Sequence, residues 1–231
     1  MWLNKHKIND AAICSYRRTL LSSNPAHIVI DDMFESTKLD EVMNCLFDER
    51  CWQNQKHTYS ALYVDNAEWQ KAEKDERFVN RDVWQRNAHS INGPSPNIAQ
   101  QFLSFLRSDE FMSLLSRIFK VELTDMNVAK PEINTNYFRL KPADFVNQHA
   151  DDSPGREVCM LLYLNKEWDS TNGGELIFMG KDEQRISIPP LYNRCVLFDP
   201  FSEGSEHWVN AVNCMNNNMY RYNVTSWYWS K

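Results

Sequence analysis

The tripeptide His149-Ala150-Asp151 places an imidazole and a carboxylate two residues apart, just before a run of turn-forming residues. Side chains two residues apart in an extended chain project to the same face, so His149 and Asp151 are expected to share one. Imidazole nitrogens and carboxylate oxygens are both ligands for first-row transition metals. The pair therefore indicates part of a metal site, although the same pattern also arises by chance at an ordinary polar strand end.

A third ligand is available from His207, the one histidine that follows the pair in the sequence. It lies in a short β-like run, which we expect to be a separate strand. Two histidines and one carboxylate on one side of a metal leave its remaining coordination positions open. We therefore expect His149, Asp151 and His207 to bind one metal ion. No ligand role is expected for the remaining histidines, His6, His27, His57 and His89.

Arg221 opens the last β-like run of the chain, RYNVTSWYW. If its face points into the core, the guanidinium needs an anionic partner, because an unpaired buried charge is very costly. That partner is either one of the 31 acidic residues or a carboxylate cosubstrate, which the guanidinium fork fits well. Alternation places Arg221 with Asn223, Thr225 and Trp227, and places Tyr222, Val224, Ser226 and Tyr228 on the opposite face.

The elements that must position these residues divide the chain into two parts. Apolar residues at helical spacing predict helices over 36–49, 95–106 and 108–119, with a short strand over 27–32. Ser36 or Thr37 is expected to cap the first helix, and Ser95 the second, with Pro96 at its first position. From residue 121 onward, short β-rich runs alternate with turn residues and predict a sandwich or barrel. We expect one α+β domain over 1–231, with helical support and loops in 1–120 and the β core in 121–231.

Residues 52–95 are polar and aromatic with weak periodicity, and we expect strand fragments joined by long loops. Segments of this length are often lids or binding elements. We hypothesise that this one covers the mouth of the β core and selects the substrate. Helix packing or dimer contacts are the alternative. The side chains suited to such a cover are Tyr59, Tyr63, Asp65 and Trp69.

Composition restricts the class of protein. Of 231 residues, 42% are hydrophobic and 13% aromatic, enough to fill a core, and the net charge of −6 argues against a nucleic-acid partner. No apolar run approaches the roughly 20 residues needed to cross a bilayer, and the N-terminus is too polar for a signal peptide. The six cysteines have no C-x-x-C spacing, and Cys159 and Cys195 lie in apolar runs. We expect a cytoplasmic protein without membrane partners.

From about Tyr137 to Trp229 the chain resembles the 2-oxoglutarate- and Fe(II)-dependent dioxygenases, specifically their prolyl 4-hydroxylase-like branch. Each matching motif is weak alone, whereas the ordered set is specific. The resemblance implies a double-stranded β-helix, a jelly-roll or cupin-like barrel with the metal at its open end and helices flanking it. The motifs, in the order of the family, are HAD, LLYLNKEW, GGEL, PPLYNRCVLF, HWV and RYNVTSWYW.

Carried over residue by residue, this resemblance makes His149, Asp151 and His207 the ligands of Fe(II). It assigns Arg221 to the distal carboxylate of 2-oxoglutarate, with Tyr163 hydrogen-bonded to the same carboxylate and Thr225 assisting. Four further residues match in type and are interpreted as turn and packing residues, namely Asn165, Trp168, Gly173 and Gly174.

The resemblance also implies an enzyme that uses Fe(II), 2-oxoglutarate and O2, supported by ascorbate. Such an enzyme hydroxylates an unactivated C–H bond of an amino-acid side chain and releases succinate and CO2. A carboxylate at position 151 favours hydroxylation, because related halogenases have a small residue there. The expected substrate is a peptide, with a prolyl residue as one target, or a free amino acid or small metabolite. Two alternatives are a catalytically silent barrel that acts as a binding module and a metal-dependent cupin-like protein that does not use 2-oxoglutarate.

Overall fold

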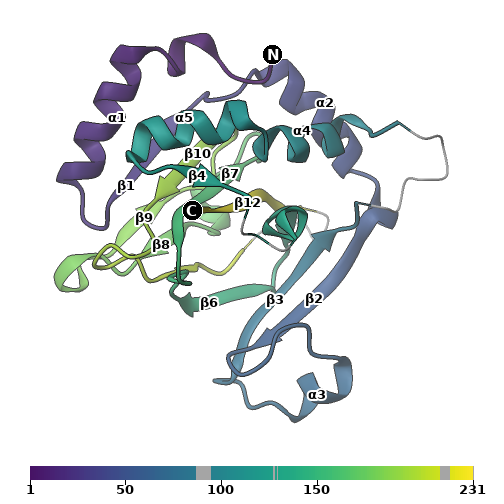
Figure 1. Cartoon of the computed structure of the whole chain (residues 1–231). Helices are drawn as coiled ribbons and strands as arrows, with labels where there is room; N and C mark the ends of the chain where they lie inside the picture. Colours follow the sequence, from purple (N-terminus) through teal and green to yellow (C-terminus); the bar gives the residue numbers. More distant parts are fainter. Residues whose placement is uncertain (87–94, 127, 129, 214–218, 231) are drawn as a thin grey trace.

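The strands form one strongly curled antiparallel sheet in a computed structural model, which describes residues 1–86, 95–126, 128, 130–213 and 219–230 (Figure 1). The strands found in these residues are β1 (His27–Asp31), β2 (Trp52–Thr58), β3 (Arg77–Trp84), β4 (Leu123–Thr124), β5 (Thr135–Leu140), β6 (Phe145–His149), β7 (Arg156–Tyr163), β8 (Leu176–Phe178), β9 (Ile186–Ile188), β10 (Arg194–Phe198), β11 (His207–Val209) and β12 (Arg221–Ser230). They are ordered β1-β10-β7-β12-β5-β3-β6-β11-β8-β9, with β2 paired to β3 and β4 to β12.

The sheet folds back on itself, so that strands far apart in its order face each other. Buried side chains of β7 and β10 share one apolar cluster with those of β8 and β9. Such contacts require two layers with a closed interior between them, because neighbouring strands in a flat sheet could not bring these faces together. The cluster consists of Cys159, Leu161, Tyr163, Leu176, Phe178, Ile188, Val196 and Phe198.

Helices cover the outer face of the longer layer, where Figure 1 shows α1, α2, α4 and α5 together. The outward side of β12 joins their core through Tyr222, Val224 and Tyr228, so the alternation predicted for this strand is confirmed. None of the described helices is long and apolar enough to cross a membrane. The helices are α1 (Asp10–Ser22), α2 (Ser36–Leu46), α3 (Asn66–Lys71), α4 (Ile98–Leu106) and α5 (Asp109–Phe119).

Two predicted helix caps are wrong. Helix α4 begins after Asn97 rather than Ser95, because Asn97 and Gln100 form a reciprocal capping box. Helix α2 begins at Ser36 but has Glu35 as its N-cap, without a side-chain cap. The chain that enters α2 is fixed by the amide side chain of Asn193, which hydrogen-bonds both backbone groups of Phe34.

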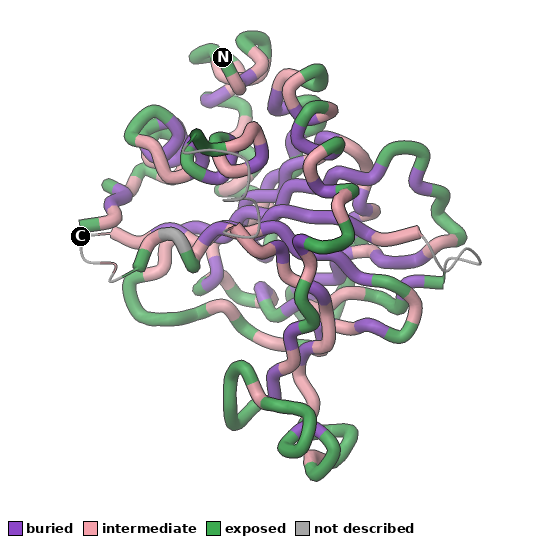
Figure 2. The backbone as a smooth tube through the Cα atoms, turned by 90° about the vertical axis from the view of Figure 1, so that its right-hand side faces the viewer, coloured by how far each residue is buried: buried purple, intermediate pink, exposed green. Residues whose placement is uncertain are grey.

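Strands β2 and β3 form a long hairpin where loops and strand fragments were expected. Their register runs from Trp52 opposite Trp84 to Thr58 opposite Arg77. Strand β3 also pairs with β5 and β6, which anchors the hairpin to the barrel. The far end of the hairpin carries α3 and projects from the body of the molecule, largely exposed (Figure 2).

This hairpin uses its aromatic and acidic residues in different ways. Asp65 caps α3 by accepting a hydrogen bond from the backbone of Glu68, and Trp69 stacks on Phe145 at a centroid distance of 6.1 Å. Both residues therefore have structural contacts, and their expected part in covering the barrel mouth stays a prediction. Tyr63, by contrast, lines a groove beside the barrel.

Three strands from the first part of the chain, β1, β2 and β3, belong to the same sheet as the strands beyond residue 121. The helical part therefore contributes directly to the β core. The assignment of residues 1–231 to one domain, with its two parts meeting at residue 120, stays a prediction.

Candidate metal centre

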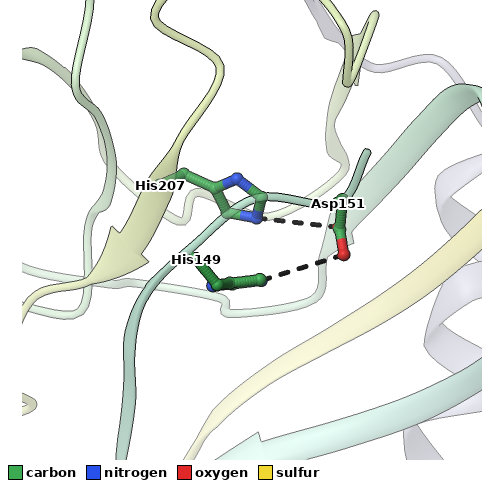
Figure 3. Close-up of side chains that lie close together, drawn as sticks. All are labelled: His149, Asp151 and His207. Carbon is green, nitrogen blue, oxygen red and sulfur yellow. Dashed lines mark ion pairs between the residues drawn. The ribbon is translucent and has the colours of Figure 1, made fainter. Parts of the chain in front are cut away.

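The metal-ligand candidates come from two neighbouring strand ends. His149 ends β6 and His207 begins β11, and the two residues are directly opposite each other in this antiparallel pair. Their ring centroids lie 4.2 Å apart. Asp151 lies in the segment after β6, not in the strand as the sequence predicted, and the turn brings its carboxylate back toward both rings (Figure 3). The chain leaves the ladder at this point, so strand alternation no longer determines the direction of Asp151.

The three side chains point their ligand atoms at one another. Oδ1 of Asp151 is 3.9 Å from Nε2 of His149, and Oδ2 is 3.8 Å from Nε2 of His207. All three ligand atoms lie within 4.8 Å of one another. In the part of the chain that the structure describes, this is the one group of His, Cys, Asp and Glu residues found with such geometry. His89 lies outside the described residues.

The backbone fixes the tautomer of both imidazoles. Nδ1 of His149 lies 3.0 Å from the carbonyl oxygen of Asn147, and Nδ1 of His207 lies 2.9 Å from that of Ser205. A carbonyl oxygen only accepts hydrogen bonds, so each Nδ1 carries the proton and each Nε2 presents its lone pair to the site. Backbone partners of this kind orient metal-binding histidines.

Asp151 is held by two side chains that sequence reasoning did not assign to it. Nη1 of Arg156 donates to Oδ1 at 3.1 Å and to the backbone oxygen at 2.7 Å, while Nε1 of Trp227 donates to Oδ2 at 2.8 Å. Burial of Asp151 acts to raise the pKa of the carboxyl. The two histidines, Arg156 and the Trp227 hydrogen bond outweigh burial, so the pKa lies below its ordinary value. The carboxylate is thus kept ionised and oriented.

Burial also affects His149, whose pKa falls to about 4, mainly because its charged form would be poorly solvated and would face His207. A neutral imidazole and an ionised carboxylate are the forms that bind metals. The donor set, two Nε2 atoms and one carboxylate, therefore fits a divalent transition metal with open positions.

Arg221 lies at the far end of the same cavity and is 1% exposed. Its Nε donates to the carbonyl oxygen of Gly174 at 2.6 Å, and its Nη1 donates to Oδ1 of Asn223 at 2.8 Å. No carboxylate among the described residues forms an ion pair with it, and its Nη2 has no hydrogen-bond partner. The structural ion pair considered from sequence is therefore not found, and burial lowers the pKa of the guanidinium.

Tyr163 and Thr225 accompany Arg221. The guanidinium carbon lies 4.9 Å from the ring centroid of Tyr163, whose buried Oη faces Arg221 without forming a hydrogen bond of normal geometry. Burial raises the pKa of Tyr163 to about 12 despite the nearby positive charge, so the hydroxyl remains a donor. Thr225 Oγ1 accepts a hydrogen bond from Asn223 Nδ2 at 2.9 Å, which connects it to Arg221 indirectly. Two orphaned buried donors, Nη2 and Oη, fit a carboxylate guest.

The tight turn at Gly173 and Gly174 packs against the side chain of Arg221. Gly174 has a φ of +74°, and a Cβ there would come within 3.0 Å of Arg221 Cδ and 3.3 Å of Trp168 Cζ2. Trp168 Nε1 donates to the carbonyl oxygen of Gly173 at 2.9 Å, and Asn165 hydrogen-bonds both backbone groups of Tyr222. These residues serve the turn and the packing, as their types suggested, but they also set the depth of Arg221.

Size alone does not identify this site. A hollow of about 500 Å³ between α2 and the start of β12 contains none of the three candidate ligands. The cavity with the ligands is much smaller and combines them with Arg221, Asn223 and Thr225. Chemistry rather than volume therefore marks the functional centre.

Comparison with known proteins agrees with this geometry. Residues 135–229 match the family profile described as the 2OG-Fe(II) oxygenase superfamily. The chain is 26% identical over 160 residues to "Prolyl 3-hydroxylase OGFOD1" of Mus musculus, an alignment that covers 67% of this chain and 27% of that protein. The Xenopus laevis protein of the same name is 28% identical over 126 residues, covering 52% and 23%. The chain thus spans about a quarter of the length of these relatives.

Solved structures share the fold. A prolyl-4-hydroxylase from Pseudomonas putida has a TM-score of 0.61 at 15% identity, covering 95% of this chain and 99% of that one. A prolyl hydroxylase from Trichoplax adhaerens, in complex with a hypoxia inducible factor oxygen degradation domain peptide fragment, has a TM-score of 0.64 at 18% identity, covering 96% and 94%. The predicted double-stranded β-helix with flanking helices is confirmed.

Proposed function

We propose that this chain is a member of the 2OG-Fe(II) oxygenase superfamily, whose profile matches residues 135–229, and that it is an Fe(II)- and 2-oxoglutarate-dependent dioxygenase that hydroxylates an amino-acid side chain. A prolyl residue in a peptide is the first candidate substrate. The two sequence relatives are named prolyl 3-hydroxylases, and the similar structures include prolyl hydroxylases. O2 is the second cosubstrate, and ascorbate supports the reaction by keeping the iron reduced.

One observation carries this proposal: Arg221 is a buried cation without an acidic partner, in the same cavity as two histidines and an aspartate. An unpaired buried charge is strongly destabilising, so it persists where a ligand supplies the missing anion. A silent binding module would not require this arrangement, and a cupin-like protein that does not use 2-oxoglutarate would leave Arg221 without a purpose.

Each residue of the site has a role that follows from its contacts. His149, Asp151 and His207 would hold Fe(II), while Arg221 and Tyr163 would bind the distal carboxylate of 2-oxoglutarate. Bound iron would supply the redox chemistry that couples oxidative decarboxylation of 2-oxoglutarate to hydroxylation of the C–H bond. O2, 2-oxoglutarate and the substrate C–H would thus give succinate, CO2 and the hydroxylated product.

The remaining contacts orient this set. Arg156 and Trp227 keep the Asp151 carboxylate ionised and directed at the two imidazoles, and Asn223 keeps the Arg221 fork directed into the cavity. Thr225 acts through Asn223. The apolar walls Leu161 and Leu176 reduce the room for water beside the reacting centre.

The direct test is succinate release by the purified protein with Fe(II), ascorbate and 2-oxoglutarate, with and without a pool of proline-containing peptides. Succinate is expected even without peptide, through uncoupled turnover, and product peptides should gain one oxygen. Asp151→Ala should abolish both. Full hydroxylation by Asp151→Ala would contradict the ligand assignment.

A binding measurement complements this assay. 2-Oxoglutarate should raise the melting temperature of the wild-type protein in the presence of Mn(II), and much less that of Arg221→Leu. Equal protection of both proteins would contradict the role of Arg221. A cytoplasmic location is part of the proposal, because a reducing compartment keeps both thiols and ferrous iron in their reduced states.

A further inference from the structure

A groove of about 550 Å³ adjoins the cavity that contains the candidate ligands. Strands β2, β3 and β5 contribute most of its described lining. Two residues, Arg81 and Trp227, line both the groove and the cavity, so the two spaces meet at these side chains. A substrate whose reacting atom lies in the cavity would therefore extend along this groove.

The groove is positively charged although the chain has a net charge of −6. Three of its lining residues are basic, namely Lys56, Arg81 and Arg86, and none of the described lining residues is aspartate or glutamate. A wall with one sign of charge raises the local concentration of oppositely charged ligands and speeds their association. The groove thus favours an anionic occupant.

Arg81 is the best-positioned of these cations. Its guanidinium carbon lies 3.5 Å from the ring centroid of Phe138, and its Nε donates to Oε1 of Gln55 at 3.1 Å. These two contacts fix the plane of the Arg81 guanidinium group. Its two terminal nitrogens form no hydrogen bond or ion pair with any described residue, so they are available to a carboxylate. Burial lowers the pKa of Arg81 to about 10, which leaves it cationic at neutral pH.

Arg81 forms no ion pair with a described carboxylate, although the charge of Asp151 acts on it through space. Among the described arginines that are buried or half-buried, Arg17, Arg77 and Arg221 also form no ion pair, but of these only Arg221 lines the same cavity as Arg81. Four others do form ion pairs. They are Arg107 with Asp125, Arg139 with Glu49 and Asp82, Arg156 with Asp151, and Arg194 with Asp31.

We propose that Arg81 binds a carboxylate of the prime substrate, and that this substrate is a peptide with Asp or Glu close to the residue that is hydroxylated. The inference rests on the proposed function for the position of the reacting residue. It also defines Arg81 as a specificity-determining residue. A groove of about 550 Å³ outside the cavity fits a peptide better than a free amino acid, because a free amino acid would not need a second space beside the cavity.

Fluorescein-labelled peptides with a central proline test this proposal. Three sets share one sequence and carry Asp, Asn or Lys at the flanking positions, and their affinities are measured by fluorescence anisotropy. Protein loaded with Mn(II) and 2-oxoglutarate is compared with metal-free protein. The Asp set should bind wild-type protein roughly tenfold to a hundredfold more tightly than the Lys set, and salt should reduce the difference.

Variants assign this preference to one side chain. Arg81→Gln should remove most of the difference, and Arg81→Glu should reverse it in favour of the Lys set. The matched control is Arg18→Glu, which makes the same charge change on the exposed side of α1 and should keep the wild-type order. Melting temperatures of all variants show that they are folded, and Arg81→Lys should retain part of the preference if a folding defect affects the others.

Several results would overturn the inference. They are an unchanged preference in Arg81→Glu, no detectable binding by any set, and equal competition by an oligouridine of matched charge. A loss of 2-oxoglutarate affinity in Arg81→Gln without a change in peptide preference would also overturn it, since Arg81 would then serve the cosubstrate. Failure of the proposed function is separate: it would appear as absent succinate and absent 2-oxoglutarate protection, whereas peptide preference is measured without turnover.

Discussion

The hydrogen bond from Trp227 to Asp151 offers the sharpest test of how the metal centre is organised. Nε1 of Trp227 donates to Oδ2 at 2.8 Å, and the carboxylate is largely buried. Phe in place of Trp227 keeps an aromatic ring and removes the donor. Hydrogen bonds to charged groups contribute about 1.5–3 kcal/mol, and partners that orient metal ligands typically change metal affinity by about 10- to 100-fold. Trp227→Phe should therefore weaken Mn(II) binding about 30-fold.

Electron paramagnetic resonance of free Mn(II) measures this affinity without dependence on turnover. Trp229→Phe is the matched control, because Trp229 lies two residues further along β12 and also stacks on Arg156, with its ring centroid 5.0 Å from the guanidinium carbon. The control should bind Mn(II) like the wild-type protein. Equal Mn(II) affinity in Trp227→Phe and Trp229→Phe would refute the orienting role of the indole.

Two further predictions concern neighbouring features. Gly174→Ala should lower 2-oxoglutarate affinity at least tenfold in isothermal titration, because its Cβ would come within 3.0 Å of Arg221 Cδ and its positive φ is strained for alanine. Burial raises the pKa of Asp144 to about 6, so between about pH 4 and 6 the folded state holds a proton that the unfolded state has released. As the pH rises across this window, the free energy of unfolding of the wild-type protein should therefore fall by about 2 kcal/mol relative to that of Asp144→Asn, as measured by urea unfolding.

A specific experimental result would contradict each of these two predictions. Wild-type 2-oxoglutarate affinity in Gly174→Ala would mean that the turn does not set the depth of Arg221, and Gly155→Ala, a positive-φ glycine away from Arg221, serves as the control. A constant difference in unfolding free energy between wild type and Asp144→Asn from pH 4 to pH 7 would show that Asp144 does not titrate as described. The size of the difference at one pH is not the test, because Asn also changes the hydrogen bonds with Asn80 and Lys141.

Strand alternation was sufficient to predict the orientation of β12. Each second residue from Arg221 to Trp227 lines the cavity, while Tyr222, Val224 and Tyr228 face the helices. This strand is buried on both faces, so its period is enforced along its length. His207 could be identified for a simpler reason, because it is the one histidine that follows the HAD tripeptide in the sequence.

Contacts between distant segments could not be predicted in the same way. Strands β2 and β3 extend beyond the core, so their polar residues show no clear alternation, and neither the hairpin nor the position of Arg81 over Phe138 was visible in the sequence. The hydrogen bonds from Arg156 and Trp227 to Asp151 depend on how the segment after β6 packs against β12, which the sequence does not show. The predicted caps were wrong because Ser is a common cap type, whereas the capping box of Asn97 depends on Gln100 three residues later.

The central claim is that His149, Asp151 and His207 bind one ferrous ion beside Arg221. Anomalous diffraction at the iron edge, from crystals grown anaerobically with Fe(II) and 2-oxoglutarate, tests it most directly. We expect one iron peak in contact with both Nε2 atoms and the Asp151 carboxylate, and a carboxylate of 2-oxoglutarate on the Arg221 fork. An iron peak elsewhere, or a cosubstrate that does not contact Arg221, would contradict the account.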